Sequence, residues 1–262
     1  MMMGLVLCGP NWLGQVELGS VLSARYADLA PVRTGNQAGA GIPGWRLIGR
    51  KPVPAAGIFA LTLLAAGSFD GINETFWWLG IIGVNPLEFP GRSAVVVPTL
   101  LGLLGAVVAL PVMFAITVWL GLAAARTKAK FTDVFERLAL SLLPIAFAYH
   151  IAHYLTSFLV NGQYTLGALN DPFARGADVL GLAPFHVTTG FFNSIATVEI
   201  IWLSQAGAVV LGHVWSVLLA HRMALGLFPE NRRAVLVTLP LSIFMILYTF
   251  LGLWLLAAPR GA

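Results

Sequence analysis

The sequence predicts an all-α fold, a polytopic bundle of about five transmembrane helices. Of its 262 residues, 58% are hydrophobic and only 10% are charged, whereas a soluble domain is about 45–50% apolar and about 25% charged. The apolar residues also gather in long blocks without charge, and the basic residues fall on alternate sides of these blocks. This composition excludes a water-soluble domain, a disordered chain and a nucleic-acid-binding protein. The net charge of +4 therefore reports topology rather than a polyanionic ligand.

The first two predicted spans are bounded by charged residues. A helix needs about 20 apolar residues to cross a hydrocarbon core of about 30 Å. Lys51 and Asp70 bracket the 18 uncharged residues 52–69, which suffice for a short first span. Between Arg92 and Arg126 lie 33 residues without a charge. Because this segment is too long for an upright span, we expect it to tilt, to kink at Pro111 or to extend into an interface.

Three further spans follow along the chain. Residues 138–160 form the third, with an expected kink near Pro144. The fourth covers residues 194–219 and is interrupted by Glu199, and the fifth covers residues 234–257. The chain start lacks a charged segment before its short apolar run, so we expect the first span to act as an uncleaved membrane signal. Cys8 is the only cysteine, which excludes an intrachain disulfide.

The basic residues predict the orientation, because cytoplasmic loops carry an excess of Lys and Arg. With the N-terminus inside, twelve Lys and Arg residues fall on the cytoplasmic side and three on the other: Arg92, Arg175 and Arg260. The predicted organisation is a cytoplasmic N-terminal segment at residues 1–51 and a transmembrane bundle at residues 52–257. The bundle has outer loops at 70–93 and 161–193, and an outer C-terminal tail follows at 258–262.

The two outer loops carry their own signals. Trp77 and Trp78 in the first loop are typical of the aromatic belt at the headgroup level of a bilayer. In the second loop, Asp171 followed by Pro172 resembles a helix start, with Asp171 as N-cap and Pro172 at the first helical position. We therefore expect a short interfacial helix over residues 172–181.

Polar side chains inside the predicted spans indicate a functional site. A charge in the centre of a span costs about 2.5–3.5 kcal/mol on insertion scales, so such residues are functional candidates. His150, His153 and Glu199 qualify. In the third span the spacing i, i+3, i+4, i+7 and i+11 places five polar residues on one helical face, which cannot point at lipid. These residues are His150, His153, Tyr154, Ser157 and Asn161.

The helical rise gives the expected depth of each candidate. If the third span ends at residue 160, His153 lies about 10 Å deep and His150 about 15 Å deep, while Glu199 lies about 8 Å deep on the fourth span. Asp70 stands at the outer end of the first span. We therefore expect an outward-facing His/carboxylate cluster. It could hold a divalent transition metal through His150, His153 and Glu199, or it could be a hydrogen-bonded polar network that stabilises helix packing. Glu199 and Asp70 are the candidate catalytic carboxylates, and the metal would activate water.

The remaining histidines suggest other readings. His213 shares a helical face with Glu199, which would also suit a proton path. A haem needs two ligands at similar depth, but His150 and His213 differ by about 13 Å, so haem is disfavoured. No glycine-rich phosphate loop with lysine, nucleophile elbow or His-Glu-x-x-His motif is present, and no cofactor-binding residues are predicted.

Three segments carry a resemblance to a known family: SFDGINET at residues 68–75, AYHIAHY at 148–154 and GHVWSVLLAHR at 212–222. They resemble bacterial integral membrane proteins that are labelled fenitrothion hydrolase or uncharacterised membrane protein. The resemblance covers residues 55–257 and corresponds to the C-terminal part of longer members, whereas the first 50 residues depart from the pattern. It implies a multi-pass protein of the bacterial inner membrane that hydrolyses organophosphate esters. The positions that match it are Asp70, His150, His153, His213 and His221.

Three functions therefore remain open at the level of the sequence. The first is a metal-dependent enzyme that attacks an apolar phosphotriester arriving from the bilayer. The second is proton-coupled transport along the polar faces of the third and fourth spans, although no internal repeat supports a transporter. The third is a non-catalytic assembly subunit whose polar face binds partner membrane helices or an upstream family subunit.

Overall fold

The computed structural model confirms the all-α bundle. It describes residues 6, 7, 9, 16–34, 38–48, 55–88, 91–182 and 185–259. Helices account for 76% of the structure. Within the described residues, five helical segments are long and apolar enough to cross a membrane. The long helices of these segments are α4 (Ala56–Asn73), α6 (Arg92–Ala124), α8 (Leu143–Asn170), α9 (Ile195–Leu227) and α10 (Asn231–Ala257). The third segment, Phe131–Asn170, also includes the shorter helix before α8.

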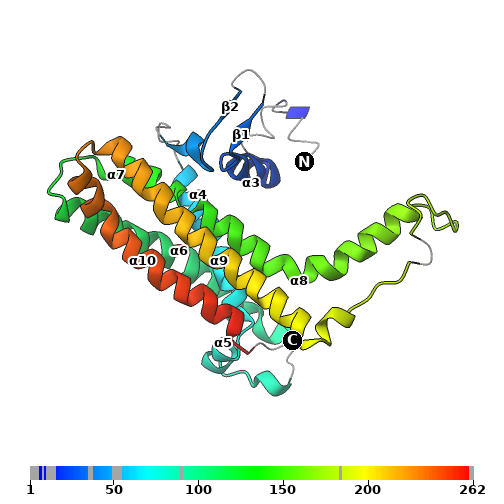
Figure 1. Ribbon diagram of the computed structural model, residues 1–262. Helices are drawn as coiled ribbons and strands as arrows, with labels where there is room; N and C mark the ends of the chain where they lie inside the picture. Colours follow the sequence, from blue (N-terminus) through cyan, green and yellow to red (C-terminus); the bar gives the residue numbers. More distant parts are fainter. Residues whose placement is uncertain are drawn as a thin grey trace.

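The five long helices pack into a closed ring. Helix α4 contacts α6, α6 contacts α10, α10 contacts α9, α9 contacts α8, and α8 returns to α4. Their connections alternate between two ends, as Figure 1 shows for the α9–α10 connection at one end and α5 with the C-terminus at the other. A hydrogen bond of 3.0 Å from the backbone N–H of Phe76 to the carbonyl of Pro259 joins the first outer loop to the C-terminal tail. Residues 260–262 of that tail lie outside the described residues.

The first two spans differ from the predicted boundaries in detail. Residues 52–54 lie outside the described residues, and α4 continues past Asp70 to Asn73. The second span is one helix of 33 residues, α6, with Pro98 and Pro111 inside it. At 1.5 Å per residue, α6 is about 50 Å long and exceeds the hydrocarbon core, as the charge-free segment predicted.

The third span is broken rather than kinked. Helix α7 (Phe131–Leu140) ends at Ser141, and α8 begins at Leu143 with Pro144 in its first turn. Proline is tolerated there because the N–H groups of a first turn have no partner within the helix. Helix α8 then continues to Asn170, ten residues beyond the predicted end at residue 160. The first part of the predicted outer loop 161–193 is therefore helical.

The predicted interfacial helix over residues 172–181 is wrong. These residues form turns and bends, and Asp171 caps the C-terminal end of α8 rather than beginning a new helix. Ala174, Gly176 and Gly181 all have positive φ, which an α-helix does not accept. The Asp171 carboxylate accepts hydrogen bonds from the backbone N–H groups of Arg175 (2.9 Å) and Gly176 (2.7 Å). These hydrogen bonds, chiefly the one from Arg175, lower the pKa of the Asp171 carboxyl. They stabilise the loop when this carboxyl is ionised.

The loop between α4 and α6 contains short helices that the sequence did not predict. They are α5 (Phe76–Ile81) and the 3-10 helix η2 (Pro86–Glu88). Thr75 caps α5, because its hydroxyl accepts the backbone N–H of Trp78 at 3.2 Å. Both tryptophans make edge-to-face aromatic contacts: Trp78 with Phe69 of α4, and Trp77 with Trp254 of α10.

The N-terminal segment is tied to the bundle. It contains α3 (Leu18–Ala27), the strands β1 (Val32–Arg33) and β2 (Gly39–Ala40), which pair antiparallel, and the 3-10 helix η1 (Trp45–Leu47). The Trp215 indole on α9 donates to the carbonyl of Pro43 at 3.0 Å. Within the segment, the buried carboxylate of Asp28 is paired with Arg25 and Arg46. The side of the membrane on which this segment lies stays a prediction.

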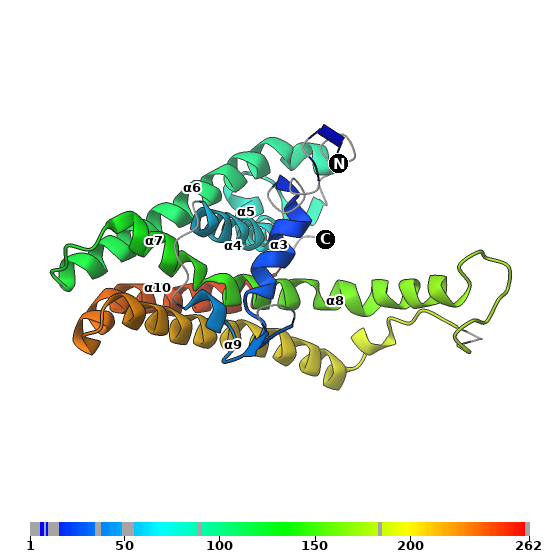
Figure 2. The ribbon, with the colours of Figure 1, turned by 90° about the horizontal axis from the view of Figure 1, so that it is seen from above.

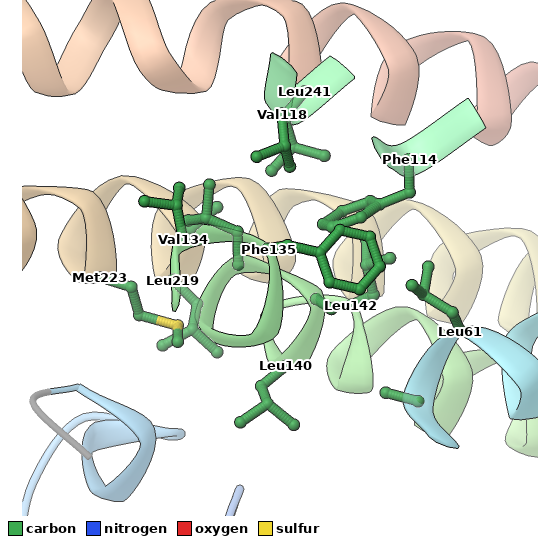
Figure 3. Close-up of a cluster of buried hydrophobic side chains, with 14 of the residues drawn as sticks. Leu61, Phe114, Val118, Val134, Phe135, Leu140, Leu142, Leu219, Met223 and Leu241 are labelled. Carbon is green, nitrogen blue, oxygen red and sulfur yellow. The ribbon is translucent and has the colours of Figure 1, made fainter. Parts of the chain in front are cut away.

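The apolar core lies at the end of the ring where α7 enters (Figure 3). Helix α7 packs against α4, α6 and α9 through the buried face that carries Val134, Phe135 and Leu138. The rings of Phe114 on α6 and Phe135 on α7 meet edge to face with centroids 5.4 Å apart. Toward the other end the ring opens, and Figure 2 shows the C-terminal half of α8 extending away from the remaining helices.

Glycines allow the closest helix contacts in the ring. A Cβ atom at Gly121 on α6 would lie 2.2 Å from the carbonyl oxygen of Val237 on α10. A Cβ atom at Gly212 on α9 would lie 2.4 Å from the Cβ of Ala148 on α8. Small residues have this role in membrane bundles, where van der Waals packing rather than the hydrophobic effect joins helices.

We predict that Gly121→Ala destabilises the protein by about 1–3 kcal/mol, because the added methyl group forces α6 away from the α10 backbone. The measurement is the temperature at which detergent-purified protein is lost from the monodisperse size-exclusion peak. Gly105→Ala, on the same helix with no atom within 4 Å of its Cβ, is the matched control and should leave that temperature unchanged. Equal behaviour of the two variants would contradict the close α6–α10 contact.

Candidate functional site

Two of the predicted site residues, Asp70 and His153, are in contact between the neighbouring helices α4 and α8. The Asp70 Oδ2 atom in the last turn of α4 lies 2.9 Å from the His153 Nε2 atom on α8. The side chain of His153 is 13% exposed and that of Asp70 is 50% exposed. The carboxylate is therefore bound on one side by the imidazole and open on the other.

The second ring nitrogen of His153 faces Tyr149, one helical turn earlier. The Tyr149 hydroxyl lies 3.4 Å from Nδ1, and the two rings are stacked with centroids 5.4 Å apart. A carboxylate only accepts hydrogen bonds, so we assign the proton of neutral His153 to Nε2. Nδ1 is then the acceptor for the Tyr149 hydroxyl. Both nitrogens of His153 are thus occupied by protein groups.

His150 is held by a different pair of groups. Its Nδ1 atom lies 2.7 Å from the carbonyl oxygen of Ala146 and 2.7 Å from the hydroxyl of Tyr26 on α3. Because a carbonyl only accepts, we assign the proton of His150 to Nδ1. The Nδ1–H group is then shared between two acceptors, the Ala146 carbonyl oxygen and the Tyr26 hydroxyl oxygen, and the lone pair of Nε2 is left for another partner. Burial raises the pKa of Tyr26, so its phenol stays protonated.

Asp70 and His150 line the same cavity between α4, α6 and α8. Its volume is about 390 Å³. The polar lining residues are Asp70, Asn73, Thr99, His150 and Tyr154, and the apolar wall is formed by Leu63, Ala66, Gly67, Phe69 and Leu103. A carboxylate and an imidazole thus line an open cavity in which polar and apolar residues are equally represented. Such a cavity suits a ligand with an apolar part and a polar centre.

Glu199 does not join this group. It is exposed, and it lines a separate cavity formed by Phe192 to Trp202, all from α9 and the segment just before it. The α8–α9 register explains the separation: the Gln205 amide donates to the carbonyl of Ala152 at 2.7 Å. In this antiparallel pair, Glu199 on α9 lies at the level of Phe158 on α8. Phe158 is more than one helical turn from His153, toward the C-terminal end of α8. The depth estimate failed because it ended the third span at residue 160, whereas α8 continues to Asn170.

The predicted metal ligands are therefore not gathered in one place. Among the residues that the structure describes, no three His, Cys, Asp or Glu side chains lie close enough together to hold a metal ion. His150 and Asp70 are the two that share a cavity, and both nitrogens of His153 already have protein partners. The divalent metal stays a prediction.

The polar face of α8 continues beyond the site without cover from the described helices. Tyr154 is 52% exposed, and Ser157 and Asn161 are also exposed. A shallow groove of about 610 Å³ runs along this part of α8 and is lined by α8 residues alone. The sequence predicted that this face points away from lipid, but no other helix of the described chain covers it.

The other histidines lie elsewhere. His213 is buried on α9 and its ring centroid lies 6.2 Å from that of Tyr248 on α10. It lines a cavity that does not include His150. His186 is exposed in the loop between α8 and α9, and His221 is partly exposed near the end of α9.

Two residues of the site were missed from the sequence. Tyr149 stands four residues before His153, a spacing at which helical side chains meet, so its contact was detectable. Tyr26 lies 124 residues from its partner His150, and no pattern in the neighbouring sequence predicts this contact. Comparison with protein-family models, curated proteins and solved structures found no match for this chain.

We predict that the Asp70–His153 contact stabilises the packing of α4 on α8. A double-mutant cycle with Asp70→Ala and His153→Phe, followed by thermal unfolding in detergent, should give a coupling energy of about 0.6–1.7 kcal/mol, the range for hydrogen bonds between membrane helices. Phenylalanine keeps the stacking on Tyr149. A cycle of Asp70→Ala with His186→Phe in the outer loop should be additive. Additivity of the first cycle as well would refute the contact.

Proposed function

We propose that this multi-pass membrane protein hydrolyses an apolar phosphotriester at the cavity lined by Asp70 and His150. The observation that carries the proposal is the shared cavity itself, with an imidazole and a carboxylate each held in place by further protein groups. The class of substrate comes from the resemblance of residues 55–257 to proteins labelled as organophosphate hydrolases. The apolar wall from α4 and α6 supports a substrate that partitions into the bilayer.

In this proposal His150 is the general base. The lone pair of its Nε2 atom takes a proton from a water molecule, whose oxygen forms a bond to phosphorus. The bond from phosphorus to the leaving oxygen breaks, and the leaving group departs as an anion. His150 carries the proton at the end of the step. Asp70 stabilises the imidazolium and orients the water, and His153 positions the Asp70 carboxylate.

The proposed orientation places the N-terminus in the cytoplasm and the C-terminus outside, in the bacterial inner membrane. The distribution of charge supports it. Described basic residues gather at the end of the ring that holds α7 and the α9–α10 connection: Arg126, Lys128, Lys130, Arg137, Arg222, Arg232 and Arg233. The Asp70 end of α4 would then face outward.

We predict that purified protein in lipid nanodiscs releases a nitrophenolate from an apolar nitrophenyl phosphotriester. His150→Gln should lower kcat/KM by about 10²–10⁴-fold, because it removes the general base. His186→Gln, in the exposed outer loop, is the control and should retain activity. An inactive wild-type protein, or full activity of His150→Gln, would contradict the proposal.

The same assay tests the predicted metal. Nitrophenolate release that survives a chelator, with no metal found by elemental analysis, would support the general-base mechanism and contradict the predicted metal. If activity instead requires a bound metal and is lost in Glu199→Gln, the ligand set His150, His153 and Glu199 replaces the general-base mechanism.

A second function, assembly with partner helices, is favoured by the uncovered polar face of α8. Tyr154, Ser157 and Asn161 are exposed on a helix within the hydrophobic segment, where lipid offers no hydrogen bonds. We propose that this face binds a transmembrane helix of a partner subunit that carries hydrogen-bonding side chains.

We predict that the protein migrates on native gels in mild detergent as a complex larger than one chain. Ser157→Leu with Asn161→Leu should release the monomer, because the interhelical hydrogen bonds are lost. Thr156→Val, a change of similar kind on a less exposed part of α8, is the control and should leave the complex intact. A wild-type monomer, or a complex that persists in the double variant, would refute the assembly function.

A further inference from the structure

Two exposed arginines stand at the same level at the ends of the neighbouring helices α6 and α10. The two helices pack together where Gly121 on α6 faces the backbone of Val237 on α10. Arg126 follows Gly121 by five residues, and Arg232 precedes Val237 by five. The end of α6 and the start of α10 lie at the same end of the bundle (Figure 1). Because the axes of packed helices are about 8–10 Å apart, both guanidinium groups can reach one ligand.

The acidic residues near these arginines are bound by other groups. Helix α7 and the α9–α10 connection together carry three of them. Asp133 pairs with Lys130 at 3.9 Å, and Glu230 pairs with Arg233 at 3.0 Å. The third carboxylate, that of Glu136, accepts a backbone N–H from the first turn of α4 at 2.8 Å. None of the three is therefore left to neutralise another cation.

Arg126 and Arg232 have no anionic partner of this kind. Their side chains are exposed, and neither forms an ion pair with a described carboxylate. Lys128 and Arg222 are two further exposed cations at the same end. This end of the bundle therefore has an excess of positive charge, which attracts an external anion.

The exposed face of α10 next to Arg232 is apolar. The residues 3, 7, 11, 14 and 18 positions after Arg232 fall on one helical face and are 45% to 67% exposed. They form the α10 stripe, which consists of Val235, Leu239, Ile243, Ile246 and Phe250. The stripe lies in a segment that is apolar enough to cross a membrane, so we expect lipid chains to cover it. A ligand at Arg232 contacts the stripe only if it carries an apolar chain of its own.

We propose that Arg126 and Arg232 together bind the phosphate of an anionic phospholipid, whose acyl chains lie along the α10 stripe. A guanidinium group binds phosphate through two parallel hydrogen bonds, which are stronger than those between neutral groups. An anionic headgroup neutralises the arginines, whereas the ammonium group of a zwitterionic headgroup is repelled by them. In the proposed orientation the lipid belongs to the cytoplasmic leaflet, where anionic lipids attract basic segments.

The lipid site is distinct from the cavity proposed for hydrolysis. Gly57, in the first turn of α4, is bound by Glu136 of α7 at the basic end of the bundle, whereas Asp70 stands in the last turn of α4. The stretch of α4 between Gly57 and Asp70 is about 20 Å long. The lipid site therefore goes beyond the proposed function and does not depend on it.

Native mass spectrometry of the full chain in mild detergent tests the lipid site. The protein is titrated separately with phosphatidylglycerol and with phosphatidylcholine, and the dissociation constant of the first bound lipid is measured. We expect tighter binding of phosphatidylglycerol. A basic residue near a headgroup contributes about fivefold to its binding, so Arg126→Gln with Arg232→Gln should weaken phosphatidylglycerol binding by about 25-fold. Excess inorganic phosphate should not displace the lipid, because it makes no contact with the α10 stripe.

Lys130→Gln with Arg233→Gln is the matched control. It removes the same amount of positive charge from the same end, but from residues that are paired with Asp133 and Glu230. The control should keep nearly the wild-type affinity for phosphatidylglycerol. Equal affinity of the wild-type protein for the two lipids, equal weakening by the two double variants, or displacement by inorganic phosphate would overturn the proposal.

Thermal unfolding supplies a second measurement. A ligand that binds only the folded state raises the unfolding temperature. Phosphatidylglycerol should therefore raise the unfolding temperature of the wild-type protein and of the control, but not that of the arginine double variant. The same experiment without lipid shows whether the arginine double variant is folded. Equal stabilisation of all three proteins would contradict the lipid site, and neither readout involves hydrolysis.

Discussion

A polar side chain inside a membrane span needs a protein partner, because hydrocarbon offers none. Among the described residues, contacts of this kind join helices of the bundle. Asp70 joins α4 to α8 through His153, the Gln205 amide joins α9 to α8 at Ala152, and the Ser216 hydroxyl joins α9 to the carbonyl of Ser141. Glycines bring the backbones close enough for these contacts, as at Gly212 against Ala148. Together they close the ring and set the register of α8 against α9.

The candidate site is a consequence of this closure. The contact that holds the end of α4 against α8 also brings the open side of Asp70 into the cavity that His150 lines. Helix α6 supplies Thr99 and Leu103 to the cavity lining, and α3 supplies Tyr26, which binds His150 from outside the ring of helices. Asp70 and His150 are therefore held by protein contacts on one side and face the cavity between α4, α6 and α8 on the other. This arrangement suits chemistry on an apolar molecule with one reactive centre.

The sequence predicted what depends on composition and helical period. The five spans follow from charge-free blocks, and the candidate status of Asp70, His150 and His153 follows from the cost of polar groups in lipid. The direct contact between Asp70 and His153 was not predicted. The position of Glu199 was wrong because nothing local marks where α8 leaves the bundle, and Asp171 was misassigned because capping residues serve both ends of a helix. Tyr26 could not be predicted, since a contact across 124 residues depends on how the N-terminal segment docks.

The most direct test of the ring closure is cross-linking between α4 and α8. In a Cys8→Ser background, Asp70→Cys and His153→Cys are introduced together and treated in the membrane with a short bifunctional thiol reagent. The structure predicts an intramolecular cross-link, detected by mass spectrometry, and none for the pair Asp70→Cys with Glu199→Cys. Failure of the first pair to cross-link, or efficient cross-linking of the second, would contradict the placement of Asp70 against His153.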